Sequence, residues 1–214
     1  MVIVTFTTQQ QPPAAHGHDH AVGLEETFDF LNTLEYEAGS PVDHLATPAD
    51  AVAWLVDHGL AHREAADRVL VRYTADARVG SRDLARLRKV RAALREVADA
   101  VVERRPASDE AVAEVNRALH DRPIAQLIPT ASGVTVGHGH AGHPFDDSLA
   151  RLAEPLVREI ATGDPDRLRV CANDQCRWVF YDTSPTGRRR WCDMATCGNR
   201  AKAARHRART KGSA

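Results

Sequence analysis

The sequence predicts an α+β protein: a mainly helical N-terminal domain that contains one small β-hairpin, followed by a small cysteine-containing module. Apolar residues recur at helical spacing along most of the first 165 residues. All four cysteines of the 214-residue chain lie together after residue 170. A chain of this length forms one or two domains, so these two observations favour a helical body with a C-terminal module.

The first helix is indicated by four apolar residues at helical spacing. They lie on one face of a helix that we expect to begin at Val22 and to end near Gly39: Leu24, Phe28, Leu31 and Leu34. Residues 1–20, which contain clustered His, Gln and Pro, have no sustained apolar period. They are expected to form a flexible tail.

The second helix has signals at both ends. Thr47 can cap it, Pro48 suits its first position, and Asp50 lies three residues after the cap. Gly59 can end this helix. A third helix is expected over residues 61–73.

Two further helices follow, each with a serine near its start. Ser81 opens an apolar stripe that predicts a helix of about 20 residues, and Pro106 lies past its end. Ser108 caps a shorter helix that continues to His120.

The helical domain ends with a hairpin and a last helix. Residues 124–128 and 134–136 flank a turn that contains Pro, Ser and Gly, which predicts a small β-hairpin. Apolar spacing predicts a helix over residues 149–160, in which Pro155 should cause a kink or separate two shorter turns.

The cysteines form two equally spaced pairs. Cys171 and Cys176 enclose four residues, as do Cys192 and Cys197, and fifteen residues separate the pairs. This pattern can place four thiolates around a tetrahedral ion, and Zn²⁺ prefers thiolates in closed structural sites. We therefore expect a C-terminal four-cysteine zinc finger with one structural Zn²⁺. Disulfides, redox-active thiols and an iron–sulfur cluster are the alternatives.

The cysteine segment is too short to bury a sufficient core without help, and metal binding would supply the missing folding free energy. Four aromatic residues are expected to pack around the metal, with base stacking by one of them as the alternative: Trp178, Phe180, Tyr181 and Trp191.

Charge is divided unequally along the chain. The whole chain has a net charge of -1, yet the residues from Arg167 onward carry twelve Lys and Arg against three Asp, a net charge of +9. The preceding residues therefore carry -10. Because four thiolates and one Zn²⁺ change the module by only -2, its excess positive charge indicates a polyanionic partner.

The basic residues gather in the loop between the cysteine pairs and in an Ala-rich segment with high helix propensity. Arginine predominates, and its planar guanidinium matches phosphate and the guanine edge. We expect nine residues to contact nucleic acid: Arg188, Arg189, Arg190, Arg200, Lys202, Arg205, Arg207, Arg209 and Lys211. A solvated tail without a partner is the alternative.

Two groups of histidines have spacings found in metal sites: His16, His18 and His20, and His138, His140 and His143. Extended backbone would place His138 and His140 on the same side. A second metal or small-ligand site competes here with a flexible polar loop.

The C-terminal motif Cys197-Gly198-Asn199-Arg200 resembles the CGNR zinc finger. Residues 28–33 (FDFLNT) and 52–60 (VAWLVDHGL) resemble the ABATE domain, which precedes this finger in bacterial proteins described as stress-induced transcription regulators. The resemblance implies an ABATE-like domain over residues 21–165 and a finger with a basic helix over residues 166–214. It also implies zinc at the four cysteines and DNA, rather than RNA, at the basic residues.

Several classes of protein are not indicated. No nucleophile elbow, phosphate-binding glycine loop or metalloprotease motif is found, so we do not predict an enzyme. No apolar run approaches the ~20 residues of a membrane-spanning helix, and the N-terminus lacks the features of a secretory signal. A cytoplasmic protein is expected.

The sequence thus predicts a zinc-dependent, DNA-binding transcription regulator, stress-responsive if it follows the family. Its helical domain would sense a ligand or partner, or form a homodimer. One alternative is an RNA-binding or ribosome-associated protein that uses the same finger. Another is a metal or small-ligand sensor, or an enzyme, centred on the histidines, with a purely structural finger.

Overall fold

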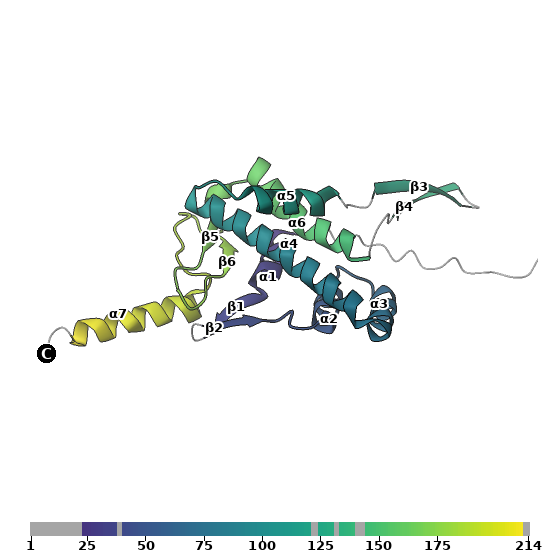
Figure 1. The fold of residues 1–214 in the computed structure, drawn as a ribbon. Coiled ribbons are helices and arrows are strands. Elements are labelled where there is room, and N and C mark those ends of the chain that lie inside the picture. The colour runs from purple at the N-terminus through teal and green to yellow at the C-terminus, as the bar shows by residue number, and fades with distance from the viewer. Residues whose placement is uncertain (1–22, 38–39, 121–123, 131–132, 140–143, 212–214) are drawn as a thin grey trace, which may run out of the picture.

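The computed structural model describes residues 23–37, 40–120, 124–130, 133–139 and 144–211 (Figure 1). The helices are α1 (Leu24–Asn32), α2 (Pro48–Asp57), α3 (Arg63–Ala75), α4 (Ala77–Glu103), α5 (Asp109–His120), α6 (Pro144–Thr162) and α7 (Asn199–Lys211). The strands are β1 (Leu34–Glu37), β2 (Ser40–Asp43), β3 (Ile124–Thr130), β4 (Gly133–Gly139), β5 (Leu168–Val170) and β6 (Val179–Tyr181). The short turns are η1 (Pro165–Arg167) and η2 (Met194–Gly198).

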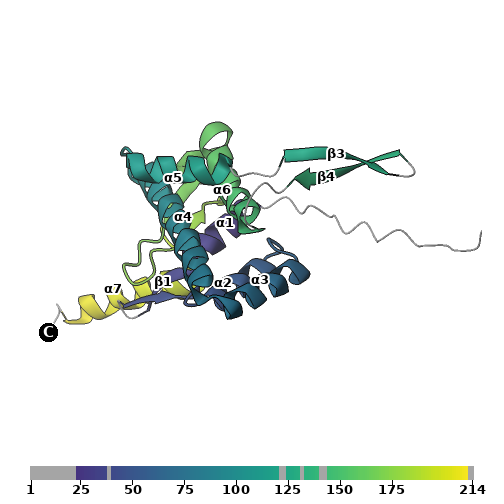
Figure 2. The ribbon, with the colours of Figure 1, turned by 45° about the vertical axis from the view of Figure 1, so that its right-hand side comes forward.

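The long helix α4 is the centre of the helical body. Helices α1, α5 and α6 pack along it, and α2 and α3 lie against its N-terminal end (Figures 1 and 2). Phe30, Leu55, Leu94 and Leu152 belong to the single large apolar core that these helices enclose. Together with the small hairpins, this arrangement confirms the predicted α+β class.

Within the described residues, three two-stranded antiparallel hairpins are attached to this body. The predicted hairpin is confirmed as β3 and β4, which extend over more residues than expected and pair from Ile124 with Gly139 to Thr130 with Gly133. Figure 1 shows this hairpin projecting from one end of the molecule, whereas α7 projects from the other. The pair β5 and β6 lies between the body and α7.

The predicted ends of α2 and the predicted start of α5 are confirmed. The side chain of Thr47 accepts a hydrogen bond from the Asp50 N–H, and Pro48 occupies the first position of α2. Gly59 adopts a φ of 66°, a left-handed conformation that suits glycine after a helix end. Ser108 Oγ accepts a hydrogen bond from the Ala111 N–H at the start of α5.

The predicted length of the first helix is wrong. Helix α1 ends at Asn32, and residues 34–37 form β1, which pairs with β2. Thr33 Oγ1 donates a hydrogen bond to the Phe30 carbonyl, and the Thr33 carbonyl accepts one from the His44 N–H. These bonds end the helix and direct the chain into a hairpin, against the apolar period that continued to Leu34.

Helix α4 begins earlier than predicted and has 27 residues. Asp76 caps it by accepting a hydrogen bond from the Arg78 N–H, whereas Ser81 lies inside it and bonds to the Ala77 carbonyl. Pro155 lies within α6, which the structure shows as one helix rather than two.

Candidate metal centre and basic helix

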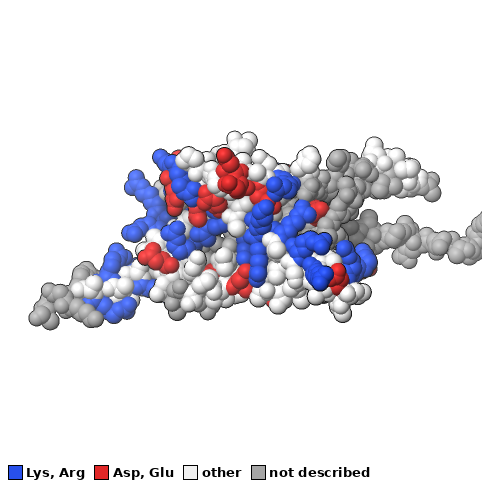
Figure 3. Space-filling model, in the orientation of Figure 1, with Lys and Arg blue, Asp and Glu red and all other residues white. Residues whose placement is uncertain are grey.

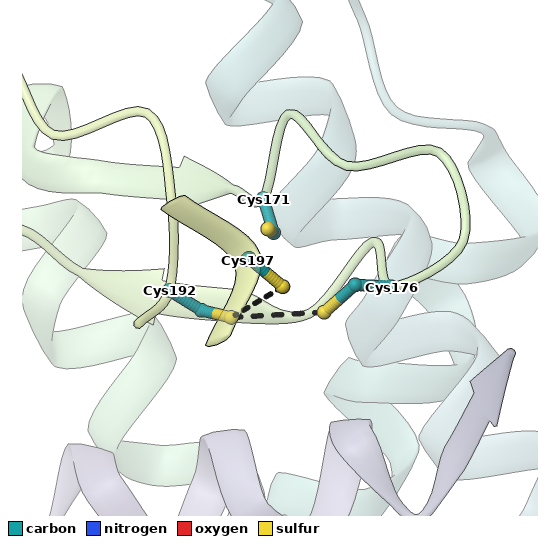
Figure 4. Close-up of side chains that lie close together, drawn as sticks. All are labelled: Cys171, Cys176, Cys192 and Cys197. Carbon is teal, nitrogen blue, oxygen red and sulfur yellow. Dashed lines mark hydrogen bonds between the residues drawn. The ribbon is translucent and has the colours of Figure 1, made fainter. Parts of the chain in front are cut away.

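The four cysteine side chains converge on one point (Figure 4). Their Sγ atoms all lie within 4.8 Å of one another, although the two pairs come from separate segments of the chain. Cys176 Sγ lies 3.6 Å from Cys192 Sγ, which in turn lies 3.9 Å from Cys197 Sγ. All four are free thiols.

These distances fit a tetrahedral zinc ion. With Zn–S bonds near 2.3 Å, ligand sulfurs stand about 3.8 Å apart, close to the separations of 3.6 and 3.9 Å in the site. A disulfide would require sulfurs about 2.05 Å apart. The soft donor set, its number and its spacing therefore agree on a structural site that could hold one Zn²⁺.

The first pair of cysteines belongs to the turn between β5 and β6. β5 runs directly into Cys171, whose N–H donates to the Trp178 carbonyl at 2.8 Å. Cys176 closes a tight turn by donating its N–H to the Asn173 carbonyl, and Arg177 then adopts a φ of 59°. The strand pair thus directs both thiols to one side of the turn (Figure 4).

The second pair lies next to the C-terminal helix: Cys192 precedes η2, and Cys197 lies within it. Asp193 caps η2 by accepting a hydrogen bond from the Thr196 N–H, and Cys197 lies at the buried end of this turn. Gly198 leads into α7, and a Cβ there would lie 2.8 Å from the Met194 side chain. A side chain at residue 198 would therefore displace the end of the flexible Met194 side chain, which is 46% exposed.

Only a few contacts join the two pairs. The Ala172 N–H donates to the Arg190 carbonyl at 2.8 Å, and Asn173 Nδ2 donates to Cys197 Sγ at 3.4 Å. Phe180 and the half-buried Trp191 pack against the cysteines. A small apolar cluster around the sulfurs thus agrees with the prediction for these two rings.

The other two aromatic residues lie elsewhere. Tyr181 packs against the core of the helical body. Trp178 is 38% exposed, and its Nε1 donates to Glu35 Oε2 of β1 at 3.2 Å. The expectation that these two rings surround the metal is therefore wrong, because Trp178 bonds to β1 and Tyr181 packs on the core of the body.

Burial is the main influence on the pKa of two of the four thiols. Burial raises the pKa of the Cys176 thiol to about 11 and raises the pKa of Cys192 as well. Protons must leave such thiols when a metal binds, so metal affinity is expected to rise with pH.

The loop before the second pair presents its arginines unequally. Asp182 is fully buried and accepts hydrogen bonds from the N–H groups of Ser184 and Arg189, which fixes the loop. Arg189 is turned inward: its Nη2 donates to the Cys192 carbonyl and its guanidinium lies over the Phe180 ring. This side chain supports the finger itself, whereas Arg188 and Arg190 are exposed.

Helix α7 presents the rest of the predicted basic surface. Its side chains from Lys202 to Ala208 are exposed, and Figure 3 shows Lys and Arg side chains along the helix. Arg200, Arg205 and Arg207 belong to this exposed surface. Arg209 and Lys211 continue the same helix.

The structure does not test the predicted histidine site, because most of its residues lie outside the described part of the chain. His138 lies on β4 opposite Ala125. The other five histidines lie outside the described residues: His16, His18, His20, His140 and His143. Within the described part of the chain, the four cysteines form the one group of side chains found that could hold a metal.

Fold and site together define a helical protein with a C-terminal four-cysteine zinc finger. Residues 167–210 match the family described as CGNR zinc finger, and residues 27–164 match ABATE, described as "Putative stress-induced transcription regulator". The chain belongs to the ABATE family, with the CGNR finger after the ABATE domain. A comparison with curated protein sequences finds no match. In the described residues, no helix is both long and apolar enough to cross a membrane.

Proposed function

We propose that the protein is a zinc-dependent, DNA-binding transcription regulator whose finger contacts the duplex through α7. The observation that carries this proposal is the basic, exposed surface of α7. Within Asn199–Lys211 six residues are basic and none is acidic. The helix has no apolar stripe to bury and projects from the molecule (Figures 1 and 2). A helix of this kind is suited to a polyanion.

The dimensions of α7 suit the major groove. Thirteen residues at a rise of about 1.5 Å span about 20 Å, and an α-helix fits a groove about 12 Å wide. At 3.6 residues per turn, one row of basic positions lies on nearly the opposite side from the other. The rows are Lys202, Arg205 and Arg209, and Arg200, Arg207 and Lys211. Each row would face one of the two phosphate backbones that border the groove.

A stripe of alanines lies between the two rows: Ala201, Ala204 and Ala208. Small side chains let a helix approach base edges, and a methyl group can contact the thymine methyl. The exposed Arg188 and Arg190 would add contacts beside the helix. The helical body would then sense the ligand or partner that regulates binding.

The proposal is tested by replacing Arg205, Arg207 and Arg209 with alanine. Binding to duplex DNA, followed by fluorescence anisotropy, should weaken for every DNA sequence. Each phosphate contact that is lost means that one counterion fewer is released on binding. The log–log salt slope should flatten by up to about three units, with zinc content unchanged. Replacing the exposed Arg68, Arg72 and Arg82 of α3 and α4 is the charge-matched control. Equal effects of the two triple variants would contradict a role for α7.

A second pair of variants tests the orientation of α7. Ala204→Leu should hinder approach to the groove, whereas Ala203→Leu, on the other side of the helix, should not. Leucine preserves helix propensity in both. Stronger binding to single-stranded RNA than to duplex DNA would favour the RNA-binding alternative.

A further inference from the structure

The open edge of β6 is bound by one side chain of the helical body. Asn32, the last residue of α1, is buried, and its amide meets both backbone groups of Val179. Asn32 Oδ1 accepts a hydrogen bond from the Val179 N–H at 2.9 Å, and Nδ2 donates to the Val179 carbonyl at 3.0 Å. The amide thus takes the place of a neighbouring strand, because it supplies the one acceptor and the one donor that the Val179 backbone groups require.

A second side chain of the body holds the residue after Cys176. Arg95 of α4 donates from Nη2 to the Arg177 carbonyl at 2.8 Å. Its own position is fixed by Asp99, one turn further along α4, whose two carboxylate oxygens lie 3.1 Å from Arg95 Nε. The carbonyl that follows the first cysteine pair is therefore anchored to a rigid helix.

These anchors act on consecutive residues. Arg177 is held by Arg95, Trp178 accepts the Cys171 N–H, and Val179 is held by Asn32. Val179 also packs in the core of the body, as does Leu168 of β5. The chain is thus fixed just before Cys171 and just after Cys176, by contacts that do not involve a metal.

We propose that Asn32 and Arg95 are positioning residues for the metal centre, so that the helical body arranges two of its four ligands before zinc binds. Fixing the backbone of both ligands in advance reduces the conformational entropy that metal binding must otherwise overcome. Groups that hydrogen-bond directly to metal ligands typically change metal affinity by roughly 10–100-fold when removed. Asn32 and Arg95 bond instead to backbone groups next to the ligands, so their removal should have a smaller effect. This inference does not depend on what α7 binds.

The coupling is reciprocal. If the folded body raises the affinity of the finger for zinc, then zinc must stabilise the folded body. Removing Asn32 should therefore lower both the zinc affinity and the stability that zinc adds to the body. A purely local role of Asn32 in α1 would change neither.

The test compares Asn32→Ala with a control on the same helix, Thr27→Val. Thr27 is buried too, and its Oγ1 donates to the Leu152 carbonyl of α6, so the control loses a buried hydrogen bond without touching the finger. Zinc affinity is measured in the full chain by competition with a chromogenic chelator. The absorption of Co²⁺ in the same site reports its tetrahedral thiolate geometry.

Asn32→Ala should weaken zinc binding by up to roughly tenfold, whereas Thr27→Val should stay within about twofold of the wild-type affinity. Asn32→Asp keeps an acceptor for the Val179 N–H but sets a carboxylate oxygen against the Val179 carbonyl, so its zinc affinity should also fall below that of the wild type. A folded Asn32→Ala protein with wild-type zinc affinity and an unchanged Co²⁺ spectrum would overturn the proposal.

Two further measurements apply if Asn32→Ala does not fold. Arg95→Ala, at a half-buried position, should also weaken zinc binding, by less than the loss of both Asn32 bonds. In the wild-type protein, zinc removal should lower the midpoint of thermal unfolding followed by helical circular dichroism. An unchanged midpoint together with unchanged affinity in Arg95→Ala would overturn the proposal.

Discussion

The two halves of the finger differ in what holds them. The first half, residues 168–181, contains the β5–β6 hairpin, and its Leu168 and Val179 are 0% and 1% exposed within the core of the body. The second half, residues 192–211, contacts the first through the sulfur cluster and the hydrogen bond from Asn173 to Cys197. Its helix α7 packs on η2 and otherwise projects outward (Figure 1).

This difference indicates two roles for one metal. In the first half, zinc would bind thiols that apolar packing already holds in place. In the second half, zinc would be the main connection between the basic helix and the rest of the molecule. The same ion can therefore add modestly to the stability of the body and control entirely whether α7 is held in position.

The largest effect is expected from Cys192→Ser. Three remaining thiolates leave an open coordination position, so the variant should lose its zinc. Residues 192–200 should then lose their structure, whereas the β5–β6 hairpin stays on the body. Metal analysis and backbone amide NMR spectra measure the two outcomes. Stoichiometric zinc in this variant would contradict the four-cysteine assignment.

A core truncation in the first half should reduce the stability of the whole body. Leu168→Ala removes a fully buried side chain and should cost about 2–5 kcal/mol in the free energy of unfolding. Met194→Ala in the second half, where the side chain is 46% exposed, should cost less than about 0.5 kcal/mol. Denaturant titration of both variants checks the contrast; equal costs would mean that the two halves are held alike.

A smaller effect is expected at the hairpin that supports the first half. Asp43 binds Arg91 through both carboxylate oxygens, at 2.7 and 2.8 Å. Burial opposes ionisation of Asp43, but the hydrogen bonds from Arg91 and the Leu45 N–H outweigh it, so the pKa of this carboxyl lies below its ordinary value.

Because this pKa is lowered on folding, the carboxylate stabilises the protein above its ordinary pKa near 4, and that stability is lost as pH falls through the folded pKa. Asp43→Asn should therefore cost about 1–3 kcal/mol at neutral pH and progressively less below pH 4. Unfolding titrations at a series of pH values measure this convergence. A cost that does not change with pH would contradict the role of the charge.

The smallest effect is expected at the exposed contact between β1 and the first half. Glu35 accepts a hydrogen bond from Trp178 Nε1 in a partly exposed position. Glu35→Gln should change the free energy of unfolding by less than about 1 kcal/mol. A larger loss in denaturant titration would assign β1 a greater part in holding the finger than its geometry indicates.

Local signals predicted much of this structure. The Thr47 and Asp50 cap, the Ser108 cap and the helical propensity of residues 200–211 depend on residues close in sequence, and all three are confirmed. The matched cysteine spacing likewise predicted the convergence of the four sulfurs.

Contacts between distant residues could not be predicted in the same way. Asn32 and Val179 are 147 residues apart, and nothing near Asn32 indicates that an open strand edge lies beside it. Gly80 is another such case: a Cβ there would lie 3.0 Å from the Tyr73 ring and 3.2 Å from Pro48, which only the packed helices reveal. The inward turn of Arg189 also depends on such packing.

The body holds the first half of the finger, and zinc holds the second. Hydrogen–deuterium exchange of the full chain, with and without a zinc chelator, tests this difference most directly. After zinc removal, the N–H groups of Cys171 and Val179, bonded to Trp178 and Asn32, should stay protected, and those of Gly198 and the first turn of α7 should exchange rapidly. Loss of protection in both halves, or in neither, would contradict this difference between the two halves.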